Sequence, residues 1–173
     1  MRWKPFKALS LCVASLLLLP AAMANDLALR GQGVASYMMF DVYQAELFIP
    51  VGIPRSDILR PGTPRRLELS YKLALDKRDI EKAAWQVLQA QWPEERLNTV
   101  RPLLDQLHAS MRNVQEGDIY RLEYQPGKEL SLSLNGQVLW QGGDARLAEM
   151  YFGIWLREPA ISPELRLSLL GKD

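Results

Sequence analysis

Histidine and cysteine are almost absent from this sequence, which contains one of each, His108 and Cys12, in 173 residues. Metal sites built from these side chains need several of them, so we expect no metal ion, and no motif indicates a cofactor. A serine or cysteine nucleophile would lack its usual base unless His108 supplied it. We interpret His108, in a helical pattern, as a surface or boundary residue rather than a general base.

An excess of charge of one sign is also missing. The chain has 21 basic and 20 acidic residues, with a formal net charge of +1. Without its first 24 residues, which hold three basic side chains and no acidic ones, it would carry about two net negative charges. Nucleic acids and anionic membranes attract basic proteins, so we expect no nucleic-acid partner.

Long apolar runs are confined to the N-terminus. Three basic residues precede an apolar run over 8–19, and the small-residue site Ala22-Met23-Ala24 follows it. This pattern is typical of a signal peptide over 1–24, cleaved after Ala24, and indicates a periplasmic protein. The alternative is an uncleaved anchor, but the run is shorter than the roughly 20 residues of a spanning helix. We expect residues 25–173 to form a single domain without a membrane span.

The glycines needed for a phosphate-binding loop are incomplete. Gly31-x-Gly33 suggests a dinucleotide fingerprint, but Ser36 occupies the position of the third glycine. A strand pattern follows it, where the fingerprint requires a helix. A Walker-type Gly-Lys-Ser and a Gly-x-Ser-x-Gly elbow are both missing. The segment therefore predicts a turn and a strand rather than a nucleotide site.

The periodicity along the chain indicates an α+β protein. Alternating or β-rich runs predict strands, and stripes at i, i+3, i+4 and i+7 predict helices. Asn135-Gly136 between alternating runs is a strong hairpin signal. The expected strands are 37–49, 66–75 and three short runs within 117–143, and the expected helical segments are 76–92, 97–111, 144–159 and 162–171. This order favours an antiparallel sheet with helices packed on it.

Pairs of charged residues lie at the expected element boundaries. Arg65-Arg66 and Lys77-Arg78 are interpreted as exposed charge. Glu94-Glu95 opens a helix, where the dipole favours acidic groups. None of these pairs has the context of a catalytic site.

Several segments carry a family resemblance when they are taken together. They are, in order, Gly31-x-Gly33-Val34, FDVYQAELFIP, PRRLELSY, GDIYRLEYQPG, LNG and YFGIWLREPAISPELRLSLLG. The set resembles the bacterial secreted branch of the chalcone isomerase-like family over residues 29–171. The resemblance implies a curved antiparallel sheet, helices packed on one face and a cleft between them. Plant relatives cyclise chalcones, whereas other branches bind fatty acids without catalysis.

The resemblance also implies a site from which one group is missing. The family places an arginine two residues after the second glycine, where it holds an enolate or carboxylate, and this position is Ala35 here. Alanine offers no donor to an oxyanion. The resemblance puts the ligand on the Ala35 side of the strand, so the candidate ligand-binding residues are Ala35, Tyr37, Met39 and Tyr43, which share a face if no bulge intervenes.

Other residues bear on this site. Arg30, Arg66 or Lys72 could supply a replacement charge from another direction. Trp155, in an apolar C-terminal helix, is interpreted as a core residue rather than a ligand contact.

Three functions remain open from the sequence. The leading hypothesis is a non-catalytic periplasmic protein that binds an apolar or amphipathic small molecule, such as a fatty acid or a lipid-derived compound. The second is an isomerase or intramolecular lyase acting on an enone, with Tyr43 or Tyr71 as acid or base, although a phenol with a pKa of about 10 is a poor base near neutrality. The third is a module that binds a protein partner in the cell envelope.

Overall fold

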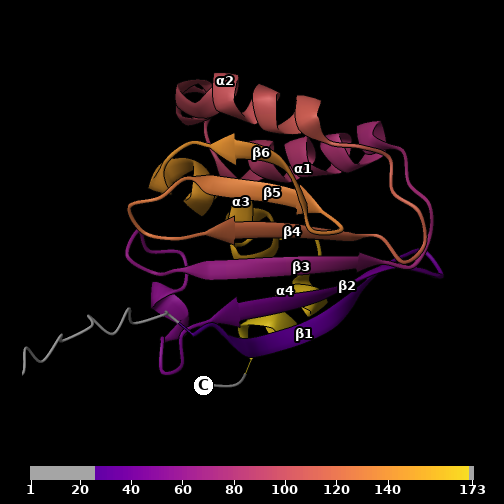
Figure 1. Cartoon of the computed structure of the whole chain (residues 1–173), viewed down its shortest axis with the longest axis horizontal. Coiled ribbons are helices and arrows are strands. Elements are labelled where there is room, and N and C mark those ends of the chain that lie inside the picture. The colour runs from indigo at the N-terminus through magenta and orange to yellow at the C-terminus, as the bar shows by residue number, and fades with distance from the viewer. Residues whose placement is uncertain (1–25, 172–173) are drawn as a thin grey trace, which may run out of the picture.

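The protein was analysed as a computed structural model that describes residues 26–171. One antiparallel sheet holds six strands in the order β1-β2-β3-β4-β5-β6, so each strand lies beside its neighbour in sequence. The strands are β1 (Ala28–Tyr37), β2 (Phe40–Ile49), β3 (Arg65–Tyr71), β4 (Ile119–Tyr124), β5 (Leu130–Leu134) and β6 (Gln137–Gly142). Figure 1 shows the curved sheet with its helices. This architecture confirms the predicted α+β class.

Four α-helices surround the inner face and one edge of the sheet. They are α1 (Lys77–Gln91), α2 (Glu94–Ser110), α3 (Ala145–Leu156) and α4 (Pro163–Leu170), and a 3-10 turn, η1, covers Arg55–Asp57. In Figure 1, α3 and α4 lie behind the sheet, and α1 and α2 pass over its β6 edge. The polypeptide between β3 and β4 forms α1 and α2, and both helices contact α3.

The helix boundaries follow the capping residues of the sequence. Asp76 accepts a hydrogen bond from the Arg78 amide at the start of α1, and Asp144 accepts from two amides of α3. Ser162 caps α4 in the same way. Such caps satisfy amides that have no partner within the helix. The second predicted helix, expected over 97–111, begins at Glu94. It continues through Pro102, which lies inside α2.

The predicted strand over 37–49 is wrong at its beginning. Residues 28–37 form a separate strand, β1, which turns back at Met38 and Met39 and pairs with β2. The segment that suggested a phosphate loop is therefore a hairpin strand. Its glycines allow close packing, because a Cβ on Gly31 would lie 2.2 Å from the Ser168 carbonyl oxygen of α4. Any side chain at Gly31 would push α4 away from β1.

One face of the sheet is buried and the other is partly exposed. In β3, Leu67, Leu69 and Tyr71 point into the core, while Glu68 on the opposite face pairs with Arg121 of β4 at 3.0 Å. This alternation is that of a strand with one face packed on the core.

Two residues that were expected near the surface are buried. Arg65 is fully buried and His108 is 5% exposed. Both predictions are therefore wrong. Arg65 begins β3 on the same face as Leu67. His108 lies in α2 between the rings of Trp85 and Tyr151, with ring centroids 5.7 Å away in each case.

Candidate functional site

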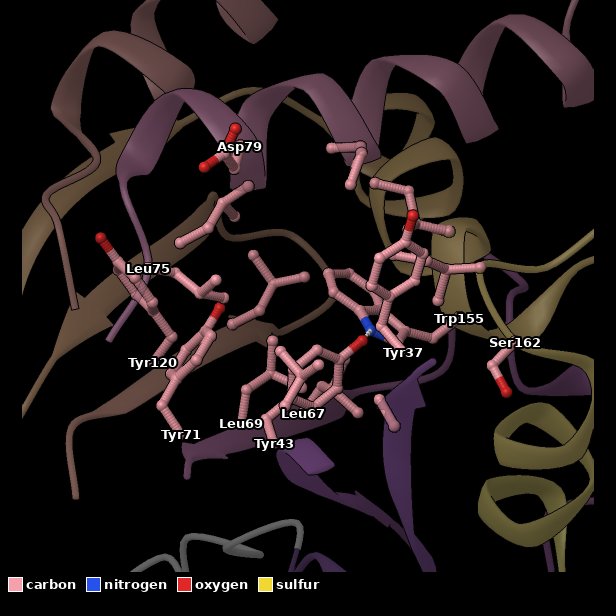
Figure 2. Close-up of a pocket in the computed structure, with 18 of the residues that line it drawn as sticks. Tyr37, Tyr43, Leu67, Leu69, Tyr71, Leu75, Asp79, Tyr120, Trp155 and Ser162 are labelled. Carbon is pink, nitrogen blue, oxygen red and sulfur yellow. Dashed lines mark hydrogen bonds between the residues drawn. The ribbon is translucent and has the colours of Figure 1, made fainter. Parts of the chain in front are cut away.

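A cavity of about 560 Å³ lies between the inner face of the sheet and helices α1 and α3. Strands β1 to β5 all contribute side chains to its wall, and α1 and α3 form the opposite side. Figure 2 shows the lining side chains converging on this space below α1. Its volume lies within the roughly 300–1,000 Å³ of small-molecule sites.

The interior of the cavity is apolar and aromatic. Of the 24 residues that line it, 19 are aliphatic or aromatic. Tyr43, Tyr71 and Tyr120 stand side by side on β2, β3 and β4, with successive ring centroids 5.6 and 6.0 Å apart. A wall of this composition favours a ligand with an extended apolar body.

The polar residues of the lining lie mostly at exposed positions. The five remaining lining residues are Ser36, Asp79, Lys82, Gln86 and Ser162. All are exposed except Ser162, which is partly buried. These five residues, called the mouth below, come from the end of β1, from α1 and from the segment before α4. A ligand with one polar end would therefore keep that end at the mouth.

Three of the four predicted ligand-binding residues line the cavity. Ala35 and Tyr43 are buried in its wall, and Tyr37 reaches it although 70% of Tyr37 is exposed. Met39 lies outside the cavity and is 92% exposed, which corrects its predicted place. The alternation of side chains that put it on the Ala35 face ends at the turn over residues 38–39, and a register shift between Ala35 and Ser36 interrupts it. Contact of the other three with a ligand stays a prediction.

Trp155 belongs to both the core and the cavity. It is 8% exposed, in agreement with its predicted core position, but it also lines the cavity. Its indole Nε1 donates a hydrogen bond to the Tyr43 hydroxyl at 3.0 Å (Figure 2). This bond satisfies the buried indole and fixes the Tyr43 ring against α3.

The buried tyrosines are poorly suited to proton abstraction. Burial raises the pKa of Tyr43 to about 12, although its hydrogen bond from Trp155 acts in the opposite direction. Burial also raises the pKa of Tyr71 well above 10, and the neighbouring Tyr43 adds to the effect. Both phenols are therefore protonated near neutral pH, and neither provides the base that an enone isomerase would need.

The cations suggested as substitutes for the family arginine do not reach the cavity. Arg30 Nε donates to the Leu170 carbonyl at 2.7 Å. Arg66 pairs with Glu68 at 3.1 Å, and Lys72 pairs with Asp41 at 3.6 Å. Among the described residues, Lys82 is the one cation that lines the cavity.

The position of Lys82 could have been predicted from the helical spacing of its neighbours. Asp79, Lys82, Ala83 and Gln86 recur at i, i+3, i+4 and i+7 along α1 and all line the cavity. This stripe borders the apolar stripe of α1, where an amphipathic helix passes from its core-facing side to its solvent side.

Neither a metal-binding cluster nor a membrane-spanning helix occurs within residues 26–171. This part of the chain contains no group of three or more histidine, cysteine or acidic side chains placed to hold a metal. None of its helices is long and apolar enough to cross a membrane. The predicted signal peptide and its cleavage site lie outside the described residues.

The fold resembles that of a solved structure over most of the chain. A fatty-acid binding protein of Arabidopsis thaliana superimposes with a TM-score of 0.65 at 16% identity, covering 88% of this chain and 90% of its own. At this identity the likeness shows the fold alone. No curated relative matches the chain. The sequence model of a family described as chalcone isomerase-like matches residues 20–171. The chain therefore belongs to the chalcone isomerase-like family.

Proposed function

We propose that this protein binds a fatty-acid-like molecule in the cavity and does not convert it chemically. The observation that carries the proposal is the apolar cavity with its polar mouth. The Arabidopsis thaliana structure that shares the fold is a fatty-acid binding protein, which supports the same class of ligand. Ala35 in place of the family arginine and the raised pKa values of Tyr43 and Tyr71 support binding without catalysis.

The position of the charges suggests an orientation for the ligand. Ala35 itself offers no donor to an anion, whereas Lys82 stands at the mouth. A carboxylate deep in an apolar cavity would cost several kcal/mol without a partner. The chain of the ligand therefore enters first, toward Tyr71 and Tyr151, and the carboxylate stays near Lys82 and solvent.

We propose in addition that the protein is periplasmic and belongs to the secreted branch of its family. The support is the signal-peptide pattern of residues 1–24 and the small-residue site that ends at Ala24. Fractionation of cells that produce the full chain tests this location, since recovery in the cytoplasm would contradict it.

Filling the cavity should weaken binding. Ala84 lies on α1, is 5% exposed and lines the cavity. We expect Ala84→Phe to weaken fatty-acid binding at least about tenfold, because the added ring occupies the space of the ligand chain. Native mass spectrometry and titration with palmitate measure this loss.

The matched control is Ala90→Phe, which makes the same change at an exposed position of the same helix outside the cavity. It should bind as the unmodified protein does. Equal affinity for all three proteins would place the ligand elsewhere, and no saturable binding by the unmodified protein would remove the proposed function. Thermal unfolding of each variant checks that it is folded.

Removing the charge at the mouth should affect acids only. We expect Lys82→Gln to weaken palmitate binding about fivefold, the effect of roughly 1 kcal/mol that an exposed ion pair provides. Binding of the corresponding fatty alcohol should not change. Lys77→Gln, on the same helix but outside the cavity, is the control. An equal loss for acid and alcohol would contradict the proposed orientation.

A further inference from the structure

Four consecutive large apolar residues are exposed at the end of the β1–β2 hairpin. Tyr37, Met38, Met39 and Phe40 are 70, 83, 92 and 66% exposed, respectively. We call these residues the apolar tip. In Figure 1 the hairpin that carries them ends at the right-hand side of the sheet. Single exposed apolar residues are ordinary, but a contiguous group of this kind indicates an interaction site.

The fold does not require apolar side chains at this turn. Met38 has a φ of +56°, a backbone conformation that favours glycine, asparagine or aspartate. In the turn between β5 and β6, Asn135 and Gly136 occupy the positions of positive φ. Methionine at position 38 accepts an unfavourable backbone conformation and buries nothing in return, so its side chain needs an explanation outside the fold.

The apolar tip is continuous with the mouth of the cavity. Tyr37 belongs to the tip and also lines the cavity. Its neighbours Ala35 and Ser36, which are outside the tip, line the cavity too. A surface that covered the tip would therefore also lie at the cavity opening. An apolar ligand could pass between that surface and the cavity without crossing much water.

A lipid bilayer fits the tip better than a protein partner does. Stable protein interfaces take roughly 20–30 residues a side, and the tip has four. Interfacial insertion needs only a few apolar and aromatic side chains, because aromatic rings favour the headgroup region. The tip itself is uncharged, and Asp41, the residue that follows it, forms an ion pair with Lys72 at 3.6 Å. Insertion therefore needs no anionic lipid.

We propose that the apolar tip inserts into the interfacial region of a lipid bilayer and holds the cavity mouth against it. The role in ligand exchange rests on the proposed fatty-acid binding, whereas insertion itself does not. Tyr37 and Phe40, opposite each other in the hairpin register, would lie at headgroup depth, with Met38 and Met39 beyond them.

A probe attached to the tip tests insertion in the full chain. Cys12→Ser leaves no other thiol, and Met39→Cys then carries one environment-sensitive nitrobenzoxadiazole label. Val51→Cys is the matched position, because it is 86% exposed and lies beyond the opposite end of β2. With phosphatidylcholine vesicles, the emission at position 39 should shift to the blue and that at position 51 should not.

The comparison of two positions removes the effect of the apolar N-terminal run, which could attach either labelled chain to a vesicle. Shifts at both positions, or at neither, would overturn the proposal. Added anionic lipid should leave the half-maximal lipid concentration nearly unchanged. A shift that appears only with anionic lipid would mean electrostatic adsorption instead of insertion, and would also overturn it.

A second variant asks whether the side chains of the tip cause insertion. Met38→Gly suits the backbone at that position, and Phe40→Ser removes an exposed ring, so the hairpin should remain folded. With the label at position 39, we expect the half-maximal lipid concentration to rise about tenfold or more, because each apolar side chain withdrawn from the bilayer lowers partitioning. Val138→Ser, 59% exposed on β6, is the control and should have no effect.

An unchanged lipid concentration after Met38→Gly and Phe40→Ser would mean that the label itself inserts, and would overturn the proposal. Neither Met38 nor Phe40 lines the cavity, so palmitate binding in solution should be the same in this variant. Loss of vesicle insertion with intact palmitate binding separates the role of the tip from that of the cavity. Failure of palmitate binding in the unmodified protein would reject the proposed function and leave the insertion result standing.

Discussion

Replacing Arg65 with alanine should lower the free energy of unfolding by about 4 kcal/mol. Arg65 is fully buried, and its Nη1 donates to the carbonyl oxygens of Ile58, Arg60 and Thr63 at 3.2, 3.1 and 2.9 Å. Alanine would leave these carbonyls without their donor and open a void. Chemical unfolding followed by tryptophan fluorescence measures the change, and the melting temperature should fall by about 10 °C.

The cation is kept in the core by aromatic rings as well as by hydrogen bonds. Its guanidinium carbon lies 4.7 Å from the ring centroid of Tyr124 and 4.9 Å from that of Phe152. The Tyr124 hydroxyl donates to the Pro61 carbonyl at 2.9 Å, so it holds the same loop. Burial lowers the pKa of Arg65 to about 10, yet the side chain stays charged at neutral pH. The two rings attract the charge, and this attraction replaces part of the hydration that the guanidinium loses on burial.

Two variants separate the hydrogen bonds from the packing. Arg65→Met retains a long apolar side chain against Tyr124 and Phe152 but donates nothing, so we expect about half of the loss caused by alanine. Arg66→Ala is the neighbouring control. Arg66 lies on the opposite face of β3 with its ion pair to Glu68, and its removal should cost less than about 1 kcal/mol. Similar losses at positions 65 and 66 would contradict the structural role assigned to Arg65.

The buried position of Arg65 could have been predicted from the pleat. Leu67, Leu69 and Tyr71 alternate with other residues and so share one face of the strand, and residue 65 has the same parity. The charge of the side chain favoured an exposed position instead. The three carbonyls that accept from Arg65 come from the loop before β3, and no pattern in the sequence indicates that a loop needs such a donor.

The turn at Met38-Met39 carried no signal of a turn. Asn135-Gly136 was identified because its residues are suited to positive φ, and the structure has both of them there. Two methionines continue an apolar run, so the alternation predicts a continuous strand and places Met39 on the same face as Ala35. Ala35, Tyr37 and Tyr43 reach the cavity because the antiparallel hairpin returns Tyr43 opposite Ala35.

The cavity itself depends on contacts that are distant in the sequence. Its wall combines Tyr43, Tyr71 and Tyr120 from three strands with Trp155 from α3, more than 100 residues after Tyr43. Periodicity predicts which face of each element is apolar, but it does not tell whether two apolar faces meet or leave space between them. The family resemblance predicted a cleft, and the structure has a cavity between the sheet and its helices.

Acid should destabilise the protein through His108, and His108→Phe should remove this effect. Burial lowers the pKa of His108 from 6.5 to about 4, with a smaller opposing effect of Asp105 and a lowering effect of Arg101. The unfolded chain therefore binds a proton near pH 6.5, and the folded chain binds it only near pH 4. Between these values the unfolded state holds more protons, so the free energy of unfolding falls as pH falls.

The expected loss is about 3 kcal/mol, complete below pH 4 and absent well above pH 6.5. His108 Nε2 is buried and has no hydrogen-bond partner among the described residues, so a proton on Nε2 would have no acceptor there. His108→Phe keeps an aromatic ring between Trp85 and Tyr151 and cannot be protonated. It should match the unmodified protein within about 1 kcal/mol at pH 7.5 and exceed its stability by roughly 2–3 kcal/mol at pH 4.5.

Urea unfolding of both proteins at a series of pH values measures the difference. The carboxylates are common to the two chains, so their titration cancels and the difference in slope reports His108 alone. His108→Gln, which also cannot be protonated but lacks the ring, should show the same pH slope as phenylalanine with a lower stability throughout. If all three proteins lose stability equally on acidification, His108 is protonated in the folded state without penalty. Its ring would then have access to water, and the close packing of α2 between Trp85 of α1 and Tyr151 of α3 would be incorrect.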